Sequence, residues 1–416
     1  MVTYFRSIAG FSLNAKIVLS YTLAKGLTLA IQGLVYNLFL LSLHFSPALI
    51  GLLDAMPAVT VLVLGVPMGV LADRIGRRSL LLWCSFLNPV SLLGLALFTD
   101  PAWQIGFGLA NGMLGSFYWI AYPAMIMESS DEDNRQLLFS LNSMLMLGVG
   151  SLGYAIGGGV TSIAAGVLHQ SAGATEPLRW AMISMAVVGL LGAIPLLWLR
   201  EAPRRIRGPH EARRRYNLGL FARLLGPDAL LSFGAGAVLS FNQLYFATVY
   251  GLAAGPLGAF LTLAGVVGSL GALASPPLVR RLGQARAAIS LQAGSIVLIV
   301  ALALAPGLAV AMAVYAVWWV IRSAIDPTYT GFAMAQAPAE QRSTLSGLYS
   351  VTWAVGFSSG PFATGWLRGL THGFTVPFLL AAGCYGVASA VLYVFFVHGR
   401  REAPAVAGAA EPAAAR

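Results

Sequence analysis

Charged side chains are scarce in this 416-residue chain. Only 10% of the residues are Asp, Glu, Lys or Arg, against 58% hydrophobic residues, whereas a typical soluble domain carries about 25% charged residues. This shortage excludes an ordinary water-soluble protein. Because a helix of about 20 apolar residues crosses a hydrocarbon core of about 30 Å, the sequence predicts an all-α integral membrane protein.

Cysteine and histidine are also scarce, with two and five residues. The two cysteines, Cys84 and Cys384, both lie within apolar runs, which excludes a disulfide framework or a zinc site. The five histidines lie in loops or at the ends of the expected spans, without the spacing of metal ligands or of a catalytic group. The sequence also contains no nucleotide-binding loop. We therefore expect no cofactor, no bound metal and no enzymatic activity.

Acidic residues are outnumbered 15 to 25 by Lys and Arg, which gives a formal net charge of +10. Such a charge is compatible with nucleic acid binding, but basic residues also accumulate on the cytoplasmic loops of membrane proteins. Here they concentrate in the loops after even-numbered spans, for example at Arg74, Arg135, Arg281 and Arg342. The pattern predicts no nucleic acid partner, a multi-pass protein of the cell inner (plasma) membrane, and both termini in the cytoplasm.

Apolar runs between polar breaks predict twelve membrane-spanning helices. They cover residues 17–43, 47–72, 79–99, 103–127, 137–167, 179–199, 228–251, 256–279, 287–306, 309–333, 344–369 and 376–397. Residues 1–16 lack the apolar core and small-residue cleavage site of a signal peptide, so the first span is expected to direct insertion.

The chain repeats itself at an offset of about 207 residues. This offset pairs Arg74 with Arg281 and Gly153 with Gly360, and it holds from span two to span five. We expect two pseudo-symmetric six-helix bundles, at 1–199 and 221–398, joined by a basic cytoplasmic linker at 200–220 and followed by a disordered tail at 399–416. Since one such unit contains a complete pathway between its halves, a monomer suffices.

The loop between spans two and three reads GVLADRIGRR from Gly69 to Arg78. It resembles the signature loop of the major facilitator superfamily (MFS), which implies the MFS fold and transport by alternating access. In that family the loop latches the cytoplasmic gate. The resemblance assigns the latch to Gly69, Asp73, Arg74, Gly76, Arg77 and Arg78, with Glu128 and Asp131 as carboxylate partners. The alternative is an ordinary basic turn without a gating role.

Span five is rich in glycine and resembles the antiporter motif of the drug-efflux branch, with Tyr154 in place of the motif's proline. Asn111 stands where efflux members commonly carry an arginine in span four, which departs from that branch. The glycines considered are Gly153, Gly157 and Gly158, with Gly360 and Pro361 as counterparts in span eleven. Ordinary packing of small residues between helices is the alternative interpretation.

Charged residues inside a membrane span need a partner or a function, because each costs at least about 2.5–3.5 kcal/mol at the bilayer centre. Arg322 and Asp326 share one face of span ten, and we expect them to line the pathway; a neutral pair that fixes span ten is the alternative. Asp54 is a second candidate for protonation. Lys25 is expected to extend to the membrane interface, and Asp228 to cap the start of span seven.

Neutral polar residues complete the candidate site. In this superfamily spans one, four, seven and ten line the cavity, and polar side chains recur at similar depth there. They are Gln32, Tyr36 and Asn37 in span one, Asn111 and Tyr118 in span four, and Asn242, Gln243 and Tyr245 in span seven. The positions of Asn37 and Asn242 suggest that the two amides face each other across the pathway.

The leading hypothesis is a secondary active transporter that works by alternating access and couples proton entry to efflux of small amphipathic, drug-like molecules. Its partners are then a small-molecule substrate, protons and the lipid bilayer. Arg322 and the amides favour an alternative, proton-coupled uptake of a polar nutrient such as a sugar or organic anion. A lipid flippase, and outside transport a membrane receptor or sensor, complete the alternatives.

Overall fold

The computed structural model describes residues 11–129, 138, 141–142, 144–200, 218–337 and 341–398, and the elements in these ranges are helical. The N-terminal bundle contains α2 (Leu13–Ser42), α3 (Pro47–Ile75), α4 (Arg77–Leu97), α5 (Pro101–Glu128), the π-helical turn η1 (Met144–Val149), α7 (Leu152–Leu168), α8 (Thr175–Ala193) and η2 (Ile194–Trp198). The C-terminal bundle contains α9 (Leu218–Leu239), α10 (Asn242–Tyr250), α11 (Ala254–Ser269), η3 (Leu270–Ala274), α12 (Ser275–Leu282), α13 (Gln284–Ala303), α14 (Leu308–Gln336), α15 (Arg342–Thr371), α16 (Thr375–Leu392) and η5 (Tyr393–His398).

The described helices have the length and composition of membrane spans. Seven segments within the described ranges are long and apolar enough to cross a bilayer, and three shorter helices are also apolar. At a rise of about 1.5 Å per residue, a helix such as α2 is about 45 Å long and exceeds the hydrocarbon thickness. The structure thus confirms the prediction of an all-α integral membrane protein.

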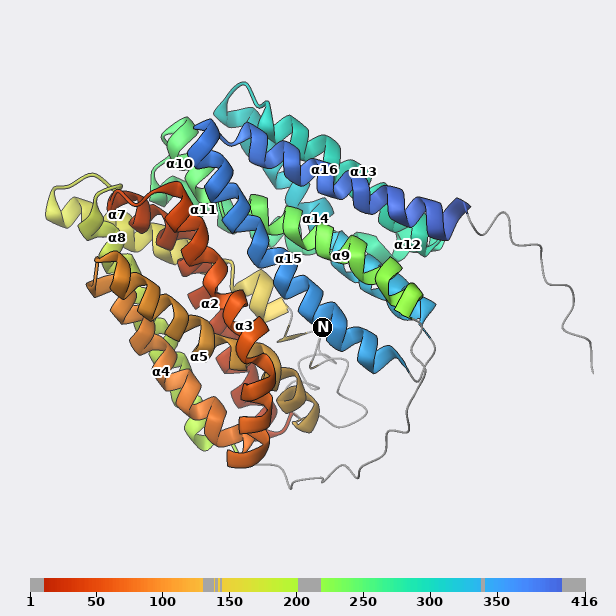
Figure 1. The fold of residues 1–416 in the computed structure, drawn as a ribbon. Coiled ribbons are helices and arrows are strands. Elements are labelled where there is room, and N and C mark those ends of the chain that lie inside the picture. Colours follow the sequence, from red (N-terminus) through yellow and green to blue (C-terminus); the bar gives the residue numbers. More distant parts are fainter. Residues whose placement is uncertain are drawn as a thin grey trace, which may run out of the picture.

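The two bundles meet near one end of the molecule and diverge towards the other (Figure 1). We call the end where they meet the closed end; it carries the turns at 43–46, 98–100, 169–174, 251–253, 304–307 and 372–374. The opposite, open end carries the turns at Gly76 and Gly283, where α3 passes into α4 and α12 into α13. Both glycines have a positive φ, 92° and 79°, which a residue with a Cβ adopts at a cost. The repeat therefore preserves the backbone of both turns.

Two spans that were predicted to be continuous are interrupted. The run at 137–167 is broken at Gly150–Ser151, between η1 and α7. The run at 228–251 is broken at Ser240–Phe241, between α9 and α10, and it starts earlier than predicted, at Leu218. The prediction treated Pro227 as a helix start, but α9 continues through it, as membrane helices tolerate proline when neighbouring groups satisfy the freed backbone.

Small residues bring the first and fifth helices of each bundle close together. A Cβ built on Gly153 of α7 would overlap the carbonyl oxygen of Leu27 in α2, and one built on Gly360 of α15 would overlap that of Phe233 in α9. These contacts join the first and fifth helices of each bundle at positions related by the sequence repeat. The pseudo-symmetry predicted from the repeat is therefore present in the packing, where small residues allow close backbone approach.

Candidate functional site

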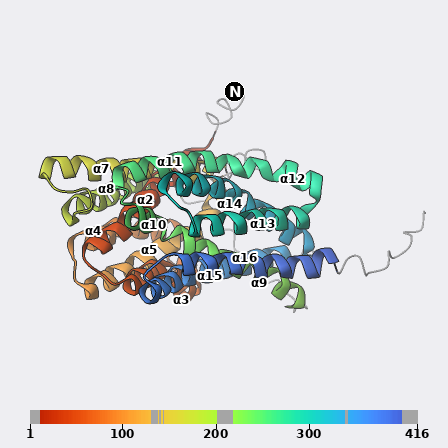
Figure 2. The ribbon, with the colours of Figure 1, turned by 90° about the horizontal axis from the view of Figure 1, so that it is seen from above.

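The closed end is sealed by two equivalent helix pairs, α3 with α15 and α7 with α11 (Figure 2). A Cβ on Gly51 of α3 would lie 2.5 Å from the carbonyl oxygen of Pro361. The matching Cβ on Gly258 of α11 would overlap the carbonyl oxygen of Tyr154. Gly51 and Gly258, like Tyr154 and Pro361, are related by the offset of the repeat. The bundles thus touch along two seams with backbone against backbone, and we call these the glycine seams.

A polar contact lies between the seams. The Asn37 Nδ2 of α2 donates to Asp54 Oδ2 of α3 at 2.7 Å and to the carbonyl oxygen of Ser240 at 2.6 Å. Ser240 lies at the break between α9 and α10, in the other bundle. Asn37 is 4% exposed, so water competes poorly for these hydrogen bonds. One amide group therefore joins the bundles and also fixes a carboxylate.

Replacing Asn37 with alanine should loosen the closed end. The change leaves the Asp54 carboxylate and the Ser240 carbonyl without this donor, and each buried unsatisfied group costs about 1–3 kcal/mol. We expect the population with separated closed-end turns to rise about tenfold. The measurement is the distance distribution between spin labels on the turns at 43–46 and 251–253. Asn14→Ala is the matched control, because the Asn14 amide on the same helix bonds the Arg200 carbonyl within its own bundle. Identical distributions for Asn37→Ala and wild type would contradict the role of this contact.

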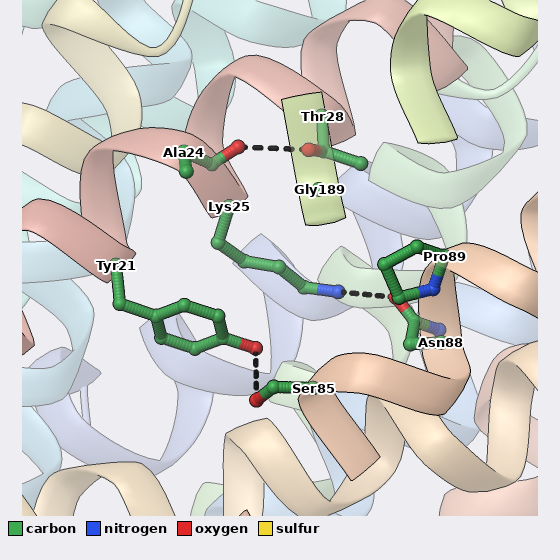
Figure 3. Close-up of a pocket in the computed structure, with 8 residues that line it drawn as sticks. All are labelled: Tyr21, Ala24, Lys25, Thr28, Ser85, Asn88, Pro89 and Gly189. Atoms are coloured by element: carbon green, nitrogen blue, oxygen red, sulfur yellow. Dashed lines mark hydrogen bonds between the residues drawn. The ribbon is translucent and has the colours of Figure 1, made fainter. Parts of the chain in front are cut away.

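A second polar cluster lies inside the N-terminal bundle (Figure 3). The Lys25 ammonium donates to Asn88 Oδ1 at 3.3 Å, and Asn88 Nδ2 donates to Asn111 Oδ1 at 2.8 Å. The Ser85 hydroxyl donates to that of Tyr21 at 2.8 Å. The prediction that Lys25 extends to the membrane interface is wrong, because Asn88 offers its amine an acceptor about 18 Å into α2. The cluster encloses a cavity of about 10 Å³, which is room for one water molecule.

The other neutral candidates lie in separate places. Tyr36 donates to Gln104 at 3.4 Å, and Asn242 donates to the Tyr315 hydroxyl of α14. Asn37 therefore contacts the backbone of Ser240, whereas the Asn242 side chain points away from Asn37 into the C-terminal bundle. Gln32 is half-buried on α2, and Tyr118 is buried with the Lys25 ammonium 5.8 Å from its ring centre.

Tyr245 and Gln243 lie near the closed end. The Tyr245 hydroxyl donates to the Leu302 carbonyl at 2.7 Å, and its ring packs against Phe246, Tyr250, Phe374 and Phe378. A Cβ on Gly33 of α2 would contact the Gln243 amide nitrogen at 3.8 Å, so Gln243 borders the other bundle. Tyr245 thus packs within its own bundle, and of these two residues Gln243 faces the interface.

Arg322 and Asp326 form an ion pair on α14, as their spacing predicted. The Nη1 of Arg322 lies 2.6 Å from Asp326 Oδ1, and the side chains are 10% and 55% exposed, respectively. The arginine therefore points into the C-terminal bundle, whereas the carboxylate is accessible at the surface of α14. Half-buried or exposed residues at Trp319, Ser323 and Asp326 recur every three or four positions, which marks one continuous face of the helix.

Asp228 is not a helix cap, so that prediction is wrong. It lies about ten residues into α9 and is 2% exposed. The Thr352 hydroxyl of α15 donates to its Oδ2 at 2.7 Å. Sequence reasoning missed this residue because Pro227 was taken as the helix start; a carboxylate flanked by apolar residues on both sides was the available signal.

The latch loop is only partly described. Gly76 forms its turn, and the Arg78 guanidinium donates to the Leu197 carbonyl of η2 at 3.2 Å, within its own bundle. The backbone of α3 continues to Ile75. The side chains of Asp73, Arg74, Arg77 and Glu128, the surroundings of Gly69, and all of Asp131 lie outside the described part of the chain.

Comparison with known proteins adds family and fold. The family model described as Major Facilitator Superfamily matches residues 18–361. A search of curated protein sequences gives no match. Among solved structures, a bacterial homologue of the human lysosomal transporter Spinster, in an inward-facing and occupied conformation, is 18% identical with a TM-score of 0.74, covering 92% of this chain and 95% of that one.

Two further structures are similar at comparable coverage. A bacterial homologue of the iron transporter ferroportin, in an inward-facing state, is 15% identical with a TM-score of 0.73 and coverage of 92% and 98%. The nucleoside transporter NupG is 13% identical with a TM-score of 0.69 and coverage of 92% and 99%. At these identities the likeness concerns the fold.

Proposed function

The chain belongs to the major facilitator superfamily and is a transporter rather than an enzyme, and on this premise we propose that it exports small amphipathic molecules in exchange for protons. The observation that carries the proposal is the pair of glycine seams. Two pseudo-symmetric bundles that touch at one end only can rock about that contact and expose a central site to each side in turn.

We assign the open end to the cytoplasm. Arg280 and Arg281 at the end of α12 and Arg286 at the start of α13 flank the turn at Gly283, and all three are exposed. Basic residues concentrate at the cytoplasmic ends of membrane helices. The protein is then in an inward-facing state, with both termini cytoplasmic in the plasma membrane, and a monomer contains the whole pathway.

Two carboxylates support proton coupling. Asp54 lies in the closed-end contact, where it accepts a hydrogen bond from Asn37. Proton uptake from outside would turn this ionised acceptor into a neutral acid and weaken the hydrogen bond. The Asn37 amide would then be less firmly oriented towards the Ser240 carbonyl. Asp326 lies on an accessible face of α14. An exposed carboxylate next to indole and other apolar groups suits an amphipathic molecule that carries a cationic group. Uptake of an anionic nutrient is less favoured, since Arg322 is buried and already paired.

The proposal is tested by flux in proteoliposomes with ethidium as the probe. When the liposome interior is acidic, protons that leave through the wild-type protein should drive ethidium into the liposomes. Collapse of the proton gradient should abolish this accumulation. Asp326→Asn should reduce gradient-driven flux at least tenfold. The control is Asp100→Asn, because the exposed Asp100 carboxylate only caps α5 by accepting from the Ala102 amide. Equal flux with and without the gradient would reject proton coupling.

A further inference from the structure

Asp228 is a buried carboxylate whose partners lie on a different helix. Thr352 Oγ1 donates to it at 2.7 Å, and Tyr349 is close enough to interact with its charge. Both partners belong to α15 and lie on one face, three residues apart. A carboxylate that is 2% exposed inside a membrane bundle is costly and calls for a function beyond packing.

The helix that holds Asp228 also forms the closed end. Gly356 of α15 packs so closely on α9 that a Cβ would overlap the Ala229 carbonyl, one residue after Asp228. Further along α15, Pro361 and Gly365 form the seam with Gly51 of α3. Helix α15 therefore contacts both the buried carboxylate and the other bundle.

Arg322 pairs directly with one carboxylate and lies within electrostatic range of a second. The charges of Arg322 and Asp326 on α14 both act on Asp228, although the arginine makes its direct ion pair with Asp326. Arg322 is buried, and its Nε–H has no acceptor among the described residues. A guanidinium offers five donors in a rigid fork, so Arg322 retains a buried donor that its pair with Asp326 does not use.

Other ionisable groups lie around this cluster on each of the neighbouring helices. Helix α15 contributes Tyr349, α14 contributes Tyr329 as well as the charged pair, and α16 contributes Tyr385 beside that pair. On α9 itself, Arg223 lies over the ring of Phe395. The centre of the cluster therefore contains two carboxylates, Asp228 and Asp326, and one cation, Arg322.

We propose that a proton on Asp228 and an organic cation on Asp326 compete for Arg322, which makes the cluster an exchange site for protons and cationic amphipathic molecules. A proton from water binds one Asp228 oxygen and neutralises it, so Arg322 pairs fully with Asp326 and displaces the cation. A cation on Asp326 releases the guanidinium towards Asp228, which favours loss of the proton. The inference rests on the proposed export function and specifies its substrate class.

The test is the pH dependence of ethidium binding to the full-length protein in lipid nanodiscs, followed by fluorescence. Wild type should bind about tenfold more weakly at low pH. Asp228→Asn mimics the protonated carboxyl, so its binding should be weak at all pH values. Asp228→Glu should restore the pH dependence, Asp326→Asn should abolish binding, and Asp100→Asn should match wild type. Wild-type pH dependence in Asp228→Asn would overturn the proton site, and a wild type that does not bind ethidium would overturn the substrate class.

Infrared difference spectra at two pH values provide a readout without substrate. A protonated-carboxyl band should be missing in Asp228→Asn and shifted in Thr352→Val, which loses the hydroxyl that bonds the carboxylate. An unshifted band in Thr352→Val would overturn the assignment. Should the band and binding behave as expected while gradient-driven flux is absent in wild type, proton-driven export fails and the exchange site stands. Should flux be present but insensitive to Asp228→Asn, proton-driven export stands and the exchange site fails.

Discussion

Gly158→Val should reduce transport at least tenfold, whereas Gly159→Val should leave it near the wild-type rate. A Cβ on Gly158 would lie 2.6 Å from the Ala254 carbonyl oxygen in the other bundle, while one on Gly159 meets nothing within 4 Å. Overpacking a tight contact costs about 1–3 kcal/mol, which corresponds to a shift in an equilibrium of about fivefold to more than a hundredfold. The cost acts between the bundles, so each bundle should still fold.

The experiment compares gradient-driven ethidium flux and closed-end spin-label distances in both variants. Gly158→Val should show a longer distance together with the loss of flux. The repeat provides an independent second pair: Gly365→Val should behave like Gly158→Val, because Gly365 packs on Pro47 and Gly51, and Gly369→Val should behave like wild type, because nothing lies within 4 Å of Gly369. Equal flux in Gly158→Val and Gly159→Val would show that the seams do not govern the conformational cycle.

The second large effect is expected at Arg322. Arg322→Gln removes the cation that pairs with Asp326 and whose charge also reaches the buried Asp228, and an uncompensated charge inside a bundle is destabilising. We expect a marked fall in the melting temperature and loss of transport. Adding Asp228→Asn removes the uncompensated charge, so the double variant should recover much of the melting temperature but no transport.

Thermal unfolding of both single variants and the double variant forms a cycle that measures the coupling. Arg179→Gln is the control, because the pair of Arg179 with Glu176 is at the surface, with side chains 26% and 45% exposed, where such pairs contribute about 0–1 kcal/mol. If Asp326→Asn, and not Asp228→Asn, rescued Arg322→Gln, the arginine would be coupled mainly to its exposed partner.

Much of the candidate site was accessible from sequence because its signals are local. Arg322 and Asp326 are one helical turn apart, and helical geometry alone places them together. Asp54 was identified from its depth in an apolar run. The partners of these groups are distant in sequence, however, and no local pattern links Asp228 to Thr352 or Asn37 to Ser240.

The sequence by itself determined the solvent, the helical class, the repeat and the family, because these follow from composition, from the length of apolar runs and from one distinctive loop. Only the tertiary structure decided which glycines form the seams, where two spans break, and that Asp228 is buried against α15 rather than capping α9. Those features depend on which helix surfaces approach each other, and that choice is made by packing across the whole bundle. Local propensity around Pro227 pointed to a helix start, and long-range contacts overrode it.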